Sequence, residues 1–138
     1  MASLNTSVSS SLLKYTFTDE DGDVIAHFRM NPADIKLAHR AEEVSEYFKS
    51  LSQNAPEEPT LETMIKLNEE VEAKMCYLLG YDVRECLFGM ISATAVMADG
   101  NMFVHTVMEK IAKTISPELQ KRQKAMEKAV NKHTAKYK

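Results

Sequence analysis

Carboxylates gather in one short stretch of this chain, YTFTDEDGDVIAHFRMNP at 15–32, where aspartates alternate beside Gly22. The aspartates are Asp19, Asp21 and Asp23. Acidic side chains at alternate positions are typical of calcium loops, but such a loop also needs glycine at position 6 and a bidentate glutamate at position 12. Counted from Asp19, those positions hold Val24 and Met30. The stretch therefore predicts an acidic hairpin turn without metal, in which Gly22 takes a positive φ.

Thiols and imidazoles are the other groups that could do chemistry. Cys76 and Cys86 lie inside apolar helical patterns and form no CxxC pair, so we expect reduced core cysteines. A zinc site from both cysteines and two histidines lacks a recognised ligand spacing. A nucleophilic pair of Cys86 with His105 is disfavoured because an apolar helix is a poor place for a thiolate. No phosphate loop, GxSxG or HExxH occurs. The sequence thus predicts a non-enzyme without cofactor or metal.

The composition predicts one mainly α-helical domain that carries these residues. The chain has 138 residues, of which only four are glycine and four are proline. Residues 1–11 read as a flexible polar tail, and 12–138 as a single helical domain. Leu13–Thr18 and Val24–Met30 are β-branched and aromatic runs around an Asp-Gly turn, which predicts a β-hairpin.

Four to five helices are expected to follow the hairpin as a bundle. Asn31 and Pro32 mark the first start, and Thr60 and Gly80 cap the second helix. Asp82 opens a third, which is apolar nearly all round, and Pro117 restarts or kinks the fourth. The expected helices cover 32–51, 61–79, 83–97, 103–115 and 117–138.

The buried face expected for the second helix is one stripe of eight residues. It consists of Leu61, Met64, Ile65, Asn68, Val71, Met75, Leu78 and Leu79. The small residues of the third helix would let another helix approach closely, and methionine suits surfaces that accept varied apolar partners, although core filling explains it as well. We therefore expect a protein-contact surface that combines Met75, Gly89, Ala93 and Met108.

Charge is distributed unevenly along the chain. Residues 117–138 hold seven Lys or Arg and two Glu, a net +5, whereas 1–116 hold ten basic and eighteen acidic residues, a net −8. This asymmetry would guide head-to-tail self-association or capture of a charged partner, with Lys121 and Lys128 as contacts. A solvated basic helix explains it equally well. A small DNA-associated regulator is the alternative function, but the segment has only Tyr137 for stacking and Arg122 as its single arginine, which argues against base readout.

The order of these elements resembles a known family. A hairpin with a DG turn runs into F-x-M-N-P-x-D-I at 28–35, several helices follow, and the C-terminus is rich in lysine. This resembles the tail assembly chaperones of long-tailed phages and prophages of Gram-positive bacteria, over residues 14–138. The resemblance implies a helical, self-associating, non-enzymatic protein that binds the tape measure protein. With no apolar run long enough for a membrane span and no secretory signal, a place in the bacterial host cytoplasm is expected.

Overall fold

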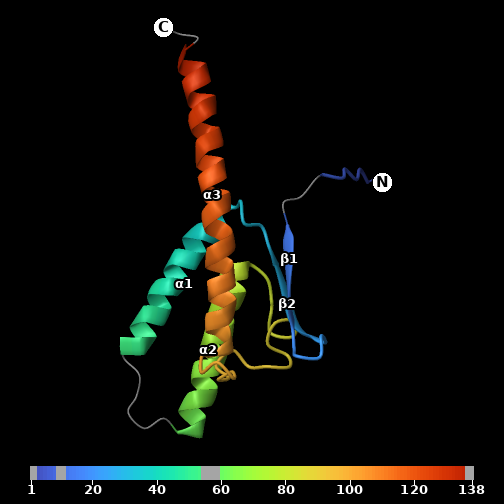
Figure 1. Ribbon diagram of the computed structural model, residues 1–138, viewed down its shortest axis with the longest axis vertical. Coiled ribbons are helices and arrows are strands. Elements are labelled where there is room, and N and C mark those ends of the chain that lie inside the picture. Colours follow the sequence, from blue (N-terminus) through green and yellow to red (C-terminus); the bar gives the residue numbers. More distant parts are fainter. Residues whose placement is uncertain (1–2, 9–11, 54–59, 136–138) are drawn as a thin grey trace.

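The structure, a computed structural model, describes residues 3–8, 12–53 and 60–135. Beyond Pro117 it describes the side chains of Lys121, Lys124 and Lys128. A two-stranded hairpin is followed by three helices (Figure 1). The elements are β1 (Leu13–Thr18), β2 (Val24–Met30), α1 (Ile35–Gln53), α2 (Leu61–Leu79) and α3 (Phe103–Ala135).

The predicted hairpin is confirmed. β1 and β2 pair antiparallel in the register Leu13↔Met30 to Phe17↔Ala26, with an irregularity before Thr18. Gly22 has φ 84°, the positive value that its place in the turn predicted. Asp19 Oδ1 accepts hydrogen bonds from the amides of Asp21 and Asp23, each at 3.0 Å. Asp19 thus closes the turn, and the carboxylates that follow it are exposed.

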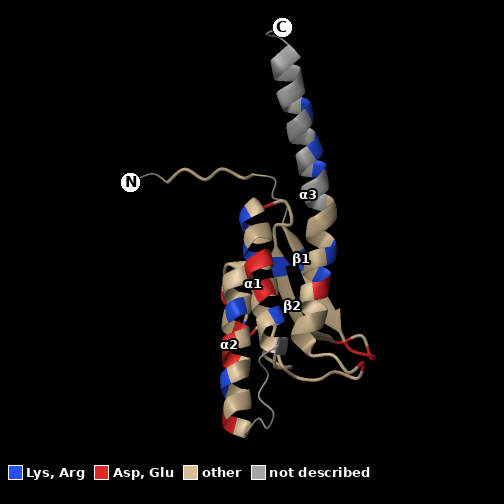
Figure 2. Ribbon diagram, turned by 90° about the vertical axis from the view of Figure 1, so that its left-hand side faces the viewer, with Lys and Arg blue, Asp and Glu red and all other residues tan. Residues whose placement is uncertain are grey.

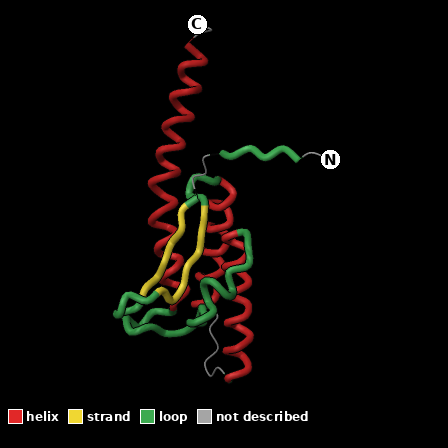
Figure 3. The backbone as a smooth tube through the Cα atoms, turned by 90° about the vertical axis from the view of Figure 1, so that its right-hand side faces the viewer, coloured by secondary structure: helices red, strands yellow, loops and turns green. Residues whose placement is uncertain are grey.

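One face of the hairpin supplies aromatic rings to the core. Phe28 is completely buried, and the rings of Tyr15 and Phe17 stack on it at centroid distances of 5.4 and 6.0 Å. Phe17 also meets Phe103, the first residue of α3, edge to face at 5.5 Å. Tyr15 and Thr114 share a hydrogen bond between their hydroxyl groups. β1 therefore lies alongside the first three turns of α3, with the hairpin turn at the N-terminal end of that helix (Figures 1 and 3).

The expectation of four to five helices is wrong, because the described part of the chain contains three. The largest error concerns 83–97, which contains turns and no helix. Short turns form there instead, through the bonds Leu87 N to Val83 O, Gly89 N to Glu85 O and Ala95 N to Ser92 O. Figure 3 shows the whole connection from α2 to α3 as a loop beside the hairpin.

Several apolar side chains of the connection are buried although it is not helical, because other elements satisfy part of its backbone. Cys86 O accepts from the amide of His27 on β2 at 2.9 Å. The carbonyls of Ala93 and Ala95 accept from the first two amides of α3, each at 2.9 Å. Val83, Leu87, Phe88 and Ala93 are buried in the core. An apolar run thus fills the centre of the domain as an irregular segment, which hydrophobic patterning alone does not distinguish from a buried helix.

The separate helices expected at 103–115 and 117–138 are one helix, α3, which passes through Pro117 without a break. Proline lacks the amide that would bind the carbonyl of Lys113. Lys113 and Pro117 are both exposed, so water can bind that carbonyl and the helix can continue. As a result, the second half of α3 extends past the end of the hairpin (Figure 1).

Candidate interaction surfaces

The contact surface expected from the sequence is not assembled on one face. Met75 and Ala93 each have an exposed fraction of 0% and belong to the core of this chain. Gly89 is exposed, and Met108 is half-buried. The expected role of Gly89 and Ala93 as the small-residue face of a third helix is a wrong prediction, because that helix does not form.

Gly89 is small for a reason internal to the chain. A Cβ atom added to it would lie 2.3 Å from the carbonyl oxygen of Glu85 and 3.2 Å from the carbonyl carbon. The first distance is far inside van der Waals contact, and the neighbour is backbone that cannot rotate away. Glycine therefore allows the tight turn over 85–89, and its identity carries no information about a partner helix.

Polar residues of α2 hold the irregular connection in place. Asn68 Oδ1 accepts from the amide and the hydroxyl of Thr94, at 3.1 and 3.0 Å. Glu72 Oε2 lies 2.6 Å from Asn68 Nδ2 and 3.4 Å from the amide of Ala93. A polar residue within the apolar stripe of α2 was the one sequence signal for this arrangement, since a half-buried amide needs hydrogen-bond partners.

The apolar stripe of α2 is buried over only half of its length. Toward the C-terminal end the stripe lies in the core, where Val71, Met75, Leu78 and Leu79 are buried. Toward the N-terminal end the same stripe is open to solvent, with exposed fractions of 73% for Leu61, 50% for Met64 and 51% for Ile65. We call these three residues the open stripe. Their burial was a wrong prediction, and their exposure leaves an apolar surface continuous with the core.

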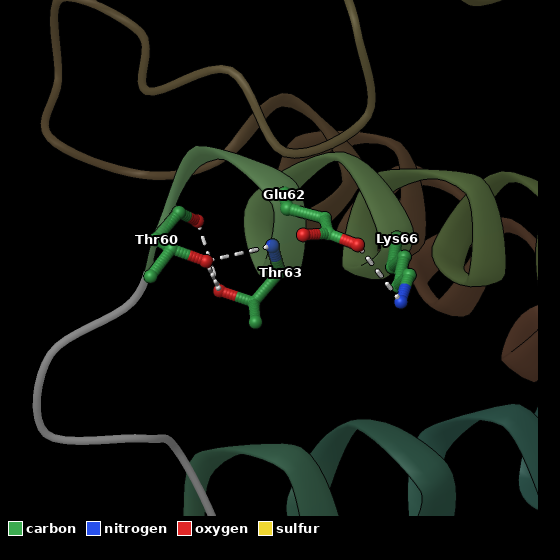
Figure 4. A network of polar contacts seen from close by, with 4 residues as sticks. All are labelled: Thr60, Glu62, Thr63 and Lys66. Carbon is green, nitrogen blue, oxygen red and sulfur yellow. Dashed lines mark hydrogen bonds and ion pairs between the residues drawn. The ribbon is translucent and has the colours of Figure 1, made fainter.

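The open stripe lies in the first turns of α2, and the start of this helix is capped. Thr60 has extended backbone angles, and its hydroxyl accepts from the amide of Thr63 at 3.2 Å, which confirms the predicted cap. Glu62 and Lys66 form an exposed ion pair one turn apart at 3.4 Å (Figure 4). The cap satisfies the free amide of Thr63 in the first turn, so the apolar side chains are presented from regular helix.

An apolar depression lies between α1 and α3. It has a volume of about 250 Å³ and is lined by Ser45, Phe48, Lys49, Val104, His105 and Met108. Met108, named from sequence as a contact residue, therefore lies at the surface with an aromatic neighbour. His105 lies against Phe48, with ring centroids 6.1 Å apart.

The thiols take part in local structure. Both cysteines are free and half-buried. Cys76 Sγ accepts from the amide of Val83 at 3.4 Å and lies 3.6 Å from Asp82 Oδ1, and Cys86 Sγ lies 3.9 Å from the carbonyl of Val83. Burial, followed by the neighbouring Cys86, raises the pKa of Tyr81, whose hydroxyl oxygen accepts from the amide of Arg29 at 2.8 Å. These contacts fix the start of the connection after α2.

No metal-binding arrangement of His, Cys, Asp and Glu occurs within the residues that the structure describes. Among the described helices, none combines the length and the apolar character that crossing a membrane requires.

Acidic residues lie in the hairpin turn, near the start of α3, and lysines lie on the second half of α3 (Figure 2). Glu20, Asp21 and Asp23 are exposed in the hairpin turn, and Lys121, Lys124 and Lys128 are exposed on the second half of α3. Lys121 and Lys128, the two lysines named from sequence, are therefore exposed, and their role as contacts stays a prediction.

Comparison of the chain with protein-family models, with curated proteins and with solved structures found no match.

Proposed function

We propose that this protein is a non-enzymatic assembly chaperone that binds an amphipathic helix through the open stripe of α2. The observation that carries the proposal is the half-covered apolar face of that helix. Its covered half packs in the core, while Leu61, Met64 and Ile65 continue the same face into solvent. Residues spaced at i, i+3 and i+4 form a patch that fits the apolar side of a second helix.

The strength of such a contact suits a chaperone that must release its client. Complete burial of a large aliphatic side chain contributes about 1.5–3 kcal/mol, and these three side chains are already partly covered. Their combined contribution is then about 3–5 kcal/mol per copy. Binding of one copy would be weak and reversible, whereas several copies along one long client would bind tightly through multivalency.

The client that we propose is the tape measure protein of a long-tailed phage or prophage. This identity rests on the resemblance of the hairpin, the F-x-M-N-P-x-D-I segment and the Lys-rich end to tail assembly chaperones. A long helical client would offer many equivalent apolar faces. The proposal includes self-association and action in the host cytoplasm, where tails assemble.

Co-expression with the tape measure gene of the same genome neighbourhood tests the proposal. We expect the client to become soluble and to co-purify with the protein, with binding that persists in high salt because apolar burial supplies it. The variant Leu61→Ser/Met64→Ser/Ile65→Ser should lose at least about tenfold in client affinity, since each lost apolar contact costs about 1 kcal/mol or more.

A matched control replaces three exposed apolar residues outside the stripe, as Ile35→Ser/Met90→Ser/Val96→Ser, and should bind the client normally. Because all six positions are exposed, both variants should fold. A client that is equally soluble alone and never co-purifies would contradict the proposed function.

A further inference from the structure

The lysines on the second half of α3 form a row on one side of the helix. At about 100° per residue, positions 121, 124 and 128 fall within about 60° of arc and span about 10 Å. All three side chains are exposed. We call them the lysine row. A straight helix that presents three ammonium groups on one face matches a compact group of carboxylates, because both place several charges within a similar length.

The hairpin turn is such a group. Glu20, Asp21 and Asp23 are exposed within four residues, and no ion pair joins them to any residue that the structure describes. Asp19 already bonds the backbone of the turn, so the turn is a defined loop that presents its other carboxylates outward. We call these three residues the acidic turn.

The two groups cannot meet within one copy. Phe17, next to the turn, packs on Phe103 at the start of α3. From Phe103 to Lys121 the helix rises about 27 Å, away from the turn (Figure 1). This separation is far beyond the reach of a lysine side chain. Any pairing of the lysine row with the acidic turn must therefore join two molecules.

We propose that the lysine row of one copy binds the acidic turn of a second copy, so that the chain associates head to tail. The occupant is a second copy because each chain carries both complementary groups, one at each end of the fold. Nucleic acid is the alternative partner, and the net charge of −3 on the protein opposes binding of this polyanion. The lysine row also contains neither arginine nor an aromatic ring that could contact bases. Contacts between different surfaces repeat from copy to copy, which gives an open chain or a ring.

This inference deepens the self-association in the proposed function, but it rests on charges rather than on the open stripe, so the two fail separately. The experiment measures the mass of the full-length protein by sedimentation velocity as a function of concentration and salt. We expect association at low salt and dissociation at high salt, because the contact is ionic.

Two charge-reversal variants locate the contact. Lys124→Glu/Lys128→Glu and Glu20→Lys/Asp21→Lys should each weaken self-association at least about tenfold at low salt, since like charges then face one another. A mixture of the two variants should associate again, because the reversed row of one complements the reversed turn of the other. The control Lys14→Glu/Lys36→Glu changes the same charge at exposed positions elsewhere and should associate normally.

Failure of the mixed variants to associate would overturn the inference, as would normal association of either variant alone. Salt-dependent retention of the wild-type protein on double-stranded DNA, with no self-association, would assign the row to nucleic acid and overturn it as well. Loss of client binding in the open-stripe variant, with unchanged sedimentation, would leave the inference intact and separate it from the proposed function.

Discussion

The conformations of single residues in this protein were predicted correctly where the adjacent residues in the sequence decide them. Gly22 and Gly80 have φ values of 84° and 80°, as a hairpin turn and a helix C-cap require. The amide of Gly80 donates to Cys76 O at 2.9 Å, which completes the cap. Thr60 caps α2 through its hydroxyl. Each of these roles depends on two to four neighbouring residues, so the sequence contains the information needed to predict it.

The need for glycine at position 89 can be recognised only from the three-dimensional structure, and substitution of Gly89 tests it. Gly89→Ala should lower the free energy of unfolding by about 1–3 kcal/mol, because a methyl group would press on the Glu85 carbonyl and force the backbone to shift. Chemical denaturation measures the change. The neighbouring control Ser92→Ala, at an exposed position, should change stability by less than about 0.5 kcal/mol.

A partner-contact role for Gly89 predicts a different result. Gly89→Ala would then leave the unfolding of the isolated protein unchanged and weaken only association or client binding. Equal stability of wild type and Gly89→Ala would therefore show that the turn accommodates a Cβ.

At the scale of elements, the spacing of apolar residues predicted correctly whether most segments form a helix or a strand. It failed where buried residues follow no regular spacing. The starts of α2 and α3 and both strands agree with expectation within a few residues. The run after Asp82 looked like a buried helix, because apolar residues occur on every side of it. Its real conformation depends on Asn68, Glu72 and His27, which are distant in sequence and supply or accept its hydrogen bonds. Tertiary hydrogen bonding of this kind cannot be inferred from a local window.

The start of that connection should be sensitive to acid through Asp82. Asp82 Oδ1 accepts from the amide of Arg84 at 3.0 Å, and this bond is the main cause that lowers the pKa of Asp82 below its ordinary value of 3.8. Because the folded pKa is lower than the unfolded one, the contribution to stability is present above pH 3.8 and is lost as pH falls through the folded pKa.

Comparison of wild type with Asp82→Asn by denaturation from neutral to acidic pH checks this. The variant should be less stable at neutral pH, and the difference should shrink once the pH falls below 3.8. Ser92→Ala, which removes no titratable group from this connection, is the control and should differ from wild type by an amount that does not change with pH. A difference between wild type and Asp82→Asn that stays constant with pH would contradict the assigned role of the carboxylate.

At the scale of the whole molecule, a single core contains residues from all the elements, which the sequence predicted as a hairpin plus a helical bundle. The hairpin, α1, α2, the irregular connection and the first half of α3 all contribute to the same cluster of buried residues. Ile115 is the last buried residue among the described side chains of α3. The candidate surfaces lie where this core ends, at the open stripe of α2 and along the second half of α3. Exposure of this kind is set by the length of neighbouring elements, which no single segment encodes.

The two halves of α3 should therefore differ in their protection from hydrogen exchange, and self-association should change only the second half. The first half buries Phe103, Val104, Val107, Ile111 and Ile115, so its amides should exchange slowly in every condition. In dilute protein at high salt, amides over 118–132 should exchange fast, because the sequence gives this half only a thin apolar stripe of Leu119, Met126 and Val130. At high concentration and low salt the same amides should slow as the lysine row docks on a second copy, while in Lys124→Glu/Lys128→Glu they should stay fast. Slow exchange throughout 118–132 in the dilute wild type would mean that this half docks within its own chain, and an extended arm would then be the wrong description of the molecule.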